Sequence, residues 1–113
     1  MEIIKILVVD DEARMRKLVK DFLSVKGYKV VEAGGGEEAI SLFMEQKDIK
    51  LILLDVMMPK MDGFETLQII REYSNVPVIM LTARSEESDE LEGYPLLMRE
   101  ISLQEGELTR DRL

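Results

Sequence analysis

The feature that most constrains this chain is a repeated alternation of short apolar segments with segments of helical periodicity. The apolar segments, rich in Ile, Leu and Val, predict strands over 3–9, 28–33, 51–54 and 78–81. Helical spacing of apolar residues or helix-start signals predict helices before Gly27 and over 37–46, 64–73 and 85–92. Alternating units of this length predict an α/β fold, a doubly wound parallel sheet with right-handed crossovers.

Composition narrows the chemistry that the chain supports. Its 113 residues suit one domain, and the net charge of −8 argues against direct nucleic-acid binding and favours divalent cations or basic partners. The absence of His and Cys excludes imidazole and thiol catalysis and disulfides, which fits a cytoplasmic protein. The apolar runs are too short to cross a membrane, and the N-terminus lacks the apolar core of a signal peptide.

Oxygen-bearing side chains follow three of the predicted strands. Asp10 and Asp11 follow the first strand, Asp55 follows the third and Thr82 the fourth. In a doubly wound sheet, sites lie at the carboxyl ends of the strands, where the strand order reverses. If the first and third strands are neighbours, three carboxylates converge in one pocket.

Such a pocket favours a hard divalent cation, because unpaired carboxylates repel one another. Mg²⁺ prefers oxygen ligands and retains several waters, and a carboxylate can act as a nucleophile toward phosphorus. Taken singly, the acidic pair is more often a solvated turn or helix cap, Asp55 a turn residue and Thr82 an ordinary strand end. The presence of such residues at three strand ends together favours a functional site over these structural interpretations.

Three stretches resemble the receiver domain of bacterial two-component response regulators. They are ILVVDDE at 6–12, LILLDVMMPKMDG at 51–63 and PVIMLTAR at 77–84. The resemblance covers about residues 3–93 and implies a flavodoxin-like receiver fold. The stretch SNVPVIMLTAR at 74–84 most resembles the subfamily that carries a winged-helix DNA-binding domain, which implies a role in regulating transcription.

The resemblance also implies roles for particular residues. Asp55 corresponds to the phospho-acceptor, and Thr82 to the switch hydroxyl that moves toward the phosphoryl group. Asp10, Asp11, Asp55 and the backbone carbonyl of Met57 correspond to the Mg²⁺ ligands. The implied partner is a sensor histidine kinase, and the implied protein is a signalling protein rather than a dedicated enzyme.

The likeness stops near Gly93, so we expect a receiver domain over 1–93 and an atypical tail over 94–113. The family continues with a fifth strand that carries a Lys followed by Pro, whereas the last lysine here is Lys60. We therefore expect a fold that is incomplete at the fifth βα unit. A truncated, chimeric or non-native end would explain this, as would a natural variant with a rebuilt C-terminus, and we favour the former because the match stops abruptly. Its exposed sheet edge predicts pairing with 101–103 or a homo-oligomer.

Two other functions compete with a phosphotransfer switch. The first is a pseudo-receiver, an interaction module with the same fold and no working switch. The second is a metal-dependent phosphohydrolase, which we disfavour because no His and no second carboxylate two residues beyond Asp55 supply an acid–base group.

Overall fold

The computed structural model describes residues 3–81, and residues 1–2 and 82–113 lie outside this description. Its elements alternate as β1 (Lys5–Val9), α1 (Ala13–Val25), β2 (Lys29–Ala33), α2 (Gly36–Glu45), β3 (Ile49–Asp55), α3 (Gly63–Arg71) and β4 (Val78–Leu81). The helix predicted over 85–92, the tail and the fifth βα unit fall outside the described residues. None of the helices within 3–81 is long and apolar enough to span a membrane.

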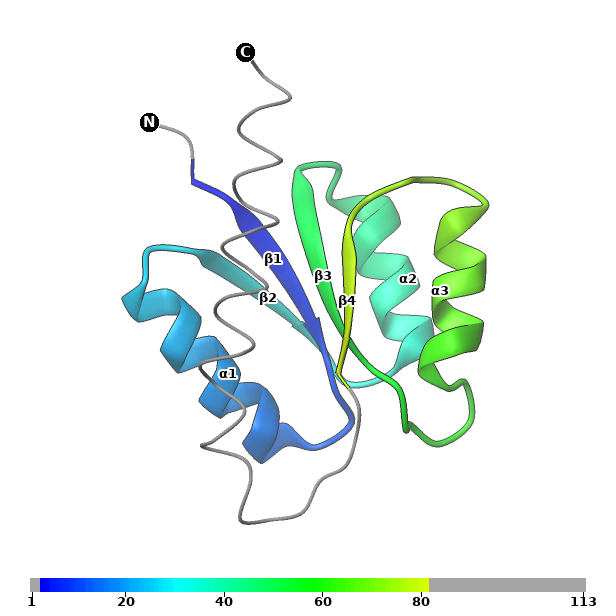
Figure 1. Ribbon diagram of the computed structural model, residues 1–113, viewed down its shortest axis with the longest axis horizontal. Coiled ribbons are helices and arrows are strands. Elements are labelled where there is room, and N and C mark those ends of the chain that lie inside the picture. The colour runs from blue at the N-terminus through cyan, green and yellow to red at the C-terminus, as the bar shows by residue number, and fades with distance from the viewer. Residues whose placement is uncertain (1–2, 82–113) are drawn as a thin grey trace.

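The four strands form one parallel sheet in the order β2-β1-β3-β4 (Figure 1). β1 and β3 are therefore neighbours, and the chain crosses over to the other side of β1 after β2. This reversal confirms the doubly wound parallel fold, and the carboxyl ends of all four strands meet at one edge.

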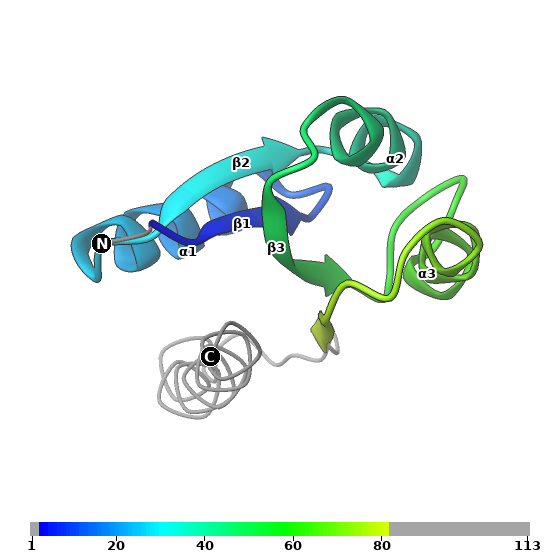
Figure 2. The same cartoon turned by 90° about the horizontal axis from the view of Figure 1, so that it is seen from above.

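The helices cover both faces of this sheet (Figure 2). α1 packs on one face, where Val19 and Leu23 join a core with Ile6, Val8, Leu51 and Leu53. α2 and α3 pack on the other face, over a core that includes Leu7, Val9, Ile52 and Leu54. Because alternate residues of β1 and β3 point into the two cores, both central strands are apolar along almost their whole length.

The bounds of β4 match the prediction, and the predicted bounds of the other elements differ from the observed ones by one or two residues. Helix α2 begins at Gly36, which the sequence pattern placed in a loop, because Gly35 already has the extended backbone of an N-cap. Gly36 lies so close to Thr66 of α3 that a Cβ would overlap the threonine hydroxyl. The absence of a side chain therefore lets the two helices approach one another.

Strand β3 also differs from its predicted bounds, since it begins at Ile49 and includes Asp55 as its last residue. Ile49 is buried, and Leu81 of β4 pairs with Asp55 at the other end. Asp55 is thus held by strand pairing rather than by a turn. In contrast, Ile3 precedes β1 and is 65% exposed.

Candidate metal and phosphoacceptor site

The predicted carboxylates meet at the carboxyl edge of the sheet. Asp10 directly follows β1, and Asp55 ends β3, whose Leu54 pairs with Val9. Together with Asp11, they offer carboxylate oxygens that all lie within 4.8 Å of one another. The neighbouring central strands therefore bring together the three acidic residues that the sequence singled out.

Backbone amides orient two of these carboxylates. The amide of Glu12 donates to Oδ1 of Asp10 at 2.9 Å, and the amide of Met57 donates to Oδ1 of Asp55 at 3.2 Å. In each case the donor lies two residues beyond the acceptor, so the chain turns back on the carboxylate just after the strand. Each carboxyl group is thus fixed by the segment that follows it.

The surroundings of the site disfavour ionised carboxylates. Burial raises the pKa of Asp10 to about 6, only partly offset by the hydrogen bond from Glu12, and repulsion from Asp55 and Asp11 adds to the increase. Burial also raises the pKa of Asp55, against the hydrogen bond from Met57. Both side chains are buried, at 8% and 9% exposure. The cluster carries negative charge that the water-excluding sheet penalises.

The described residues supply no ion-pair partner to offset that charge. The four ion pairs found within 3–81 involve the carboxylates of Asp21, Glu32 and Asp48 instead. A cluster of three oxygen donors, in which the pKa values of Asp10 and Asp55 are raised, fits a small hard cation such as Mg²⁺. Bound there, the ion would favour the ionised form of each carboxylate.

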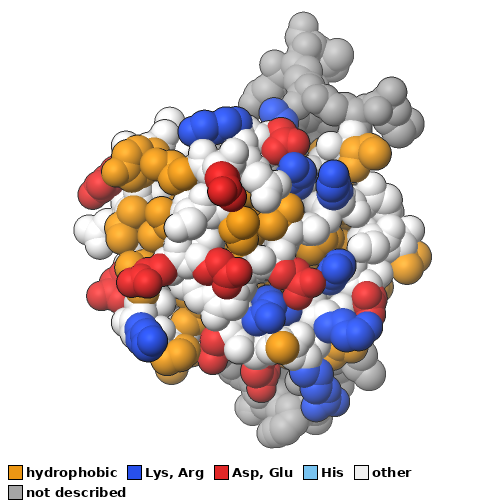
Figure 3. Space-filling view, turned by 180° about the vertical axis from the view of Figure 1, so that it is seen from behind, with side chains coloured by type: hydrophobic (Ala, Val, Ile, Leu, Met, Phe, Trp, Pro, Cys, Tyr) orange, Lys and Arg blue, Asp and Glu red, His pale blue; other side chains and the backbone are white. Residues whose placement is uncertain are grey.

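The face of the molecule shown in Figure 3 differs from the carboxyl edge in the signs of the charges that lie together. Figure 3 shows acidic and basic side chains interspersed across that face, with apolar side chains in small groups between them. Charges of opposite sign can compensate one another there. The cluster of Asp10, Asp11 and Asp55 instead gathers charges of one sign.

The loop after Asp55 is tied closely to the acceptor strand. The amide of Gly63 donates to the carbonyl of Val56 at 2.9 Å, and a Cβ on Gly63 would overlap the backbone carbonyl of Asp55. Asp62 begins α3 with a capping box, in which its side chain accepts from the amide of Glu65 and the Glu65 side chain accepts from the amide of Asp62. The N-terminus of α3 is therefore anchored against the end of β3.

Two predicted participants are not placed by these contacts. Thr82 lies just outside the described residues, one position beyond the end of β4. Met57 lies beside Asp55 and its side chain is 67% exposed, but the role of its carbonyl as a ligand stays a prediction.

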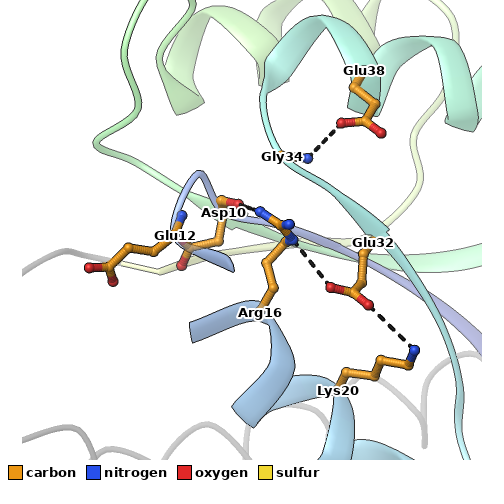
Figure 4. Close-up of polar contacts among 7 residues, drawn as sticks. All are labelled: Asp10, Glu12, Arg16, Lys20, Glu32, Gly34 and Glu38. Atoms are coloured by element: carbon orange, nitrogen blue, oxygen red, sulfur yellow. Dashed lines mark hydrogen bonds and ion pairs between the residues drawn. The ribbon is translucent and has the colours of Figure 1, made fainter. Parts of the chain in front are cut away.

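Sequence reasoning missed the residues behind Asp10. Arg16 of α1 contacts the carbonyl of Asp10 and the side chain of Glu32, which also pairs with Lys20 (Figure 4). The helical spacing places Arg16 one turn after Glu12 and Lys20 one turn further. The position of Glu32 on β2 depended on the register of the β1–β2 pair, which no local pattern determines.

A parallel sheet with helices on both faces and an acidic pocket at its carboxyl edge defines a class of α/β domain that can hold a divalent cation beside a nucleophilic carboxylate. Residues 6–101 match the model of the response regulator receiver domain, and the chain belongs to this family. Proteins of this family are signalling proteins of two-component systems rather than dedicated enzymes, and phosphorylation of an Asp by a histidine kinase is general to them.

The relatives of this chain include transcriptional regulators. It is 49% identical over 92 residues to the "probable transcriptional regulator ycf27" of Porphyridium aerugineum, covering 81% of this chain and 38% of the relative. It is 49% identical over 90 residues to the transcriptional regulatory protein ResD of Bacillus subtilis, covering 80% and 37%. The chain thus spans well under half the length of these relatives.

Solved structures show the same fold. The Vibrio cholerae chemotaxis protein CheY4 matches with a TM-score of 0.70 and 33% identity, covering 83% of this chain and 80% of that one. A chain from the structure of histidine kinase ThkA in complex with response regulator protein TrrA matches with a TM-score of 0.68 and 38% identity, covering 77% and 78%.

Proposed function

We propose that Asp55 accepts a phosphoryl group from a sensor histidine kinase, in a Mg²⁺-dependent reaction. The ligands of the ion are Asp10, Asp11, Asp55 and the backbone carbonyl of Met57, and Thr82 supplies the switch hydroxyl. The observation that carries the proposal is the convergence of the three carboxylates at the ends of neighbouring strands, within 4.8 Å of one another. Membership of the receiver family supports it.

The chemistry requires little more than a positioned nucleophile. A carboxylate oxygen of Asp55 forms a bond to phosphorus while the bond from phosphorus to the donor's imidazole nitrogen breaks, and the bonding electron pair returns to the imidazole. When bound by these residues, Mg²⁺ would supply positive charge that offsets the charge on the transferring group. The amide of Met57 holds the Asp55 carboxylate in place, and the buried edge limits access of water.

Intact-mass spectrometry after incubation with acetyl phosphate and Mg²⁺ tests this function. The wild-type chain is expected to gain the mass of one phosphoryl group, and Asp55→Asn is expected to gain none. Asp62→Asn is a matched control, because Asn also caps helices and Asp62 lies outside the carboxylate cluster. Equal labelling of wild type and Asp55→Asn would reject Asp55 as the acceptor.

A pseudo-receiver that only binds partners is the second candidate. The positions of the lysines favour it, because no Lys follows Lys60 in this sequence and the family's fifth-strand lysine therefore has no counterpart here. A folded wild-type chain that stays unlabelled, with the Mg²⁺ site intact, would support this alternative. Labelling confined to Asp55 would exclude it.

The wider role follows from the relatives. We infer that the chain takes part in the regulation of transcription in the cytoplasm, because its relatives include transcriptional regulators. It contributes the phospho-accepting part, without contacting DNA or membrane itself. The predicted homo-oligomer rests on the sheet edge at β4, the last strand of the described sheet, and on the tail, which falls outside the described residues. Size-exclusion chromatography with light scattering tests it.

A further inference from the structure

A basic side chain lies behind the acidic edge and joins three elements. Arg16 of α1 donates from Nη1 to the backbone carbonyl of Asp10 at 2.7 Å, and from Nε to Oε1 of Glu32 at 3.2 Å. Glu32 belongs to β2, and its other oxygen pairs with Nζ of Lys20 at 3.4 Å. Figure 4 shows this chain of contacts running from the end of β1 across α1 to β2.

The position of Asp10 explains why its carbonyl needs this donor. Its amide donates to the carbonyl of Ala33 at 3.1 Å, and β2 ends at Ala33. The carbonyl of Asp10 therefore lies past the last strand pair, although Asp10 is only 8% exposed. A buried carbonyl without a partner is costly, and the guanidinium of Arg16 supplies the partner that the strand does not.

The amide, the carbonyl and one carboxylate oxygen of Asp10 are thereby held by three different parts of the chain. Ala33 accepts from its amide, Arg16 donates to its carbonyl, and the amide of Glu12 donates to its carboxylate at 2.9 Å. The planar fork of arginine suits this task, because it reaches two acceptors at once in a fixed geometry. Glu32 holds the other arm of the fork and so limits the orientations available to Arg16.

We propose that Arg16, held by Glu32, is a positioning residue that keeps the Asp10 carboxylate oriented for Mg²⁺. The inference rests on the proposed function, because it takes Asp10 as a ligand of the ion. Arg16 acts through the backbone of Asp10 and the turn to Glu12 rather than by contact with the ion. Such outer partners commonly change metal affinity by about ten- to a hundredfold when removed.

The direction in which Mg²⁺ affinity changes when Arg16 is replaced distinguishes a positioning role from a purely electrostatic one. Arg16→Met removes a positive charge near an acidic site, so electrostatics alone predicts tighter Mg²⁺ binding. Loss of positioning predicts weaker binding. A residue that only stabilises the fold would lower the free energy of unfolding and leave the Mg²⁺ affinity of the folded protein unchanged.

Isothermal titration of the full chain with Mg²⁺ measures this sign. We expect Arg16→Met to bind Mg²⁺ about tenfold more weakly than wild type. Lys17→Met is the matched control on the same helix, since it removes the same charge from a side chain that is 75% exposed and pairs with Asp21. Its affinity is expected to stay within about twofold of wild type, because exposed charges are screened.

Two further variants test whether Glu32 holds Arg16 in place, and they give a result even if Arg16→Met does not fold. Glu32→Gln is expected to weaken Mg²⁺ binding more than Asp21→Asn, which removes the same charge from the control pair. Arg16→Lys keeps the charge but offers no planar fork, and is expected to restore part of the affinity lost in Arg16→Met. In the metal-free protein, the amide NMR signal of Glu12 is expected to shift in Arg16→Met and not in Lys17→Met.

The outcomes distinguish this inference from the proposed function. Unchanged or tighter Mg²⁺ binding in Arg16→Met, with wild type binding normally, would overturn the positioning role alone. A wild-type chain that binds no Mg²⁺ would overturn the metal site and the inference together. If Arg16→Met does not fold, equal affinities of wild type, Arg16→Lys and Glu32→Gln would overturn the positioning role.

Discussion

The two central strands differ sharply between their middle and their carboxyl end. In β1, Ile6 to Val9 are fully buried and apolar, yet the next residue is the buried carboxylate of Asp10. In β3, Leu53 and Leu54 are likewise fully buried, and Asp55 follows at 9% exposure. The same strands thus supply the core that stabilises the fold and the carboxylates that oppose it.

This difference shows how the site is held. Burial of the strand interiors gains free energy from the removal of apolar surface from water, whereas burial of the carboxylates raises their pKa values. The position of the acidic residues is therefore imposed by the core beside them. Variants in the two regions are expected to have opposite effects on stability.

The largest effect is expected in the core. Leu51→Ala removes a side chain that is 1% exposed, four positions before Asp55, and leaves a cavity on the α1 face. We expect the free energy of unfolding in urea to fall by about 3 kcal/mol. Ile3→Ala, at a 65% exposed position, serves as the control and is expected to change it by less than about 0.5 kcal/mol. Equal effects would show that the core does not dominate stability.

A gain in stability, opposite to the loss expected for Leu51→Ala, is expected at the carboxyl end of β1. Asp10→Asn removes a group whose pKa is raised from 3.8 to about 6 by burial. In metal-free protein at about pH 7, we expect the variant to be more stable by on the order of 2 kcal/mol. Chemical unfolding measures this change, and calorimetry is expected to show that Mg²⁺ binding is lost. A destabilised Asp10→Asn would contradict the cost assigned to this carboxylate.

The dependence on pH follows from the same group. Because the pKa of Asp10 is higher in the folded protein than in the unfolded chain, the folded protein keeps the Asp10 proton to a higher pH. The contribution of the protonated Asp10 side chain to the free energy of unfolding is therefore fully present at low pH. It is lost as the pH rises from about 4 to the folded pKa of about 6. The difference in stability between Asp10→Asn and wild type is therefore expected to grow across this range and then level off. A constant difference would exclude the shift.

A smaller effect is expected where α3 begins. Asp62→Ala removes one half of the capping box with Glu65, and is expected to reduce stability by about 1 kcal/mol. Thermal unfolding monitored by circular dichroism measures the loss. Asp62→Asn keeps a capping side chain and is expected to retain most of the stability. A loss as large in Asp62→Asn would point to charge rather than capping.

The smallest effect is expected at Lys60, in the loop beside the site. Its φ of 67° lies in the left-handed region that non-glycine residues rarely adopt. Lys60→Gly relieves this conformation, and we expect a gain of about 0.5 kcal/mol in urea unfolding, since glycine also loses more chain entropy on folding. Lys60→Ala keeps a Cβ and serves as the control; an equal gain there would rule out backbone strain as the cause.

The sequence predicted the fold and the carboxylate cluster because both depend on local patterns. Alternating strands and helices imply a parallel sheet, and acidic residues after adjacent strands must share its edge. The roles of Met57 and Thr82 stay predictions, and the tail over 94–113 lies outside the described residues.

What the sequence could not predict depends on distant contacts. The close approach of Gly36 to Thr66 depends on how α2 packs against α3, and the anchoring of Arg16 depends on the register that pairs Glu32 with Val8. The pKa of Asp10 depends on how completely the sheet excludes water from it. Each of these features depends on packing between residues that are far apart in the sequence.

The loop from Val56 to Gly63 has a consequence for changes in chain length. Its ends are joined by the hydrogen bond between these two residues, and Gly63 lies against the backbone of Asp55. An inserted or deleted residue would displace α3 from the acceptor strand. The turn at Gly27 is restricted for another reason: a side chain there would meet no other atom, but a φ of 98° would strain any residue other than glycine.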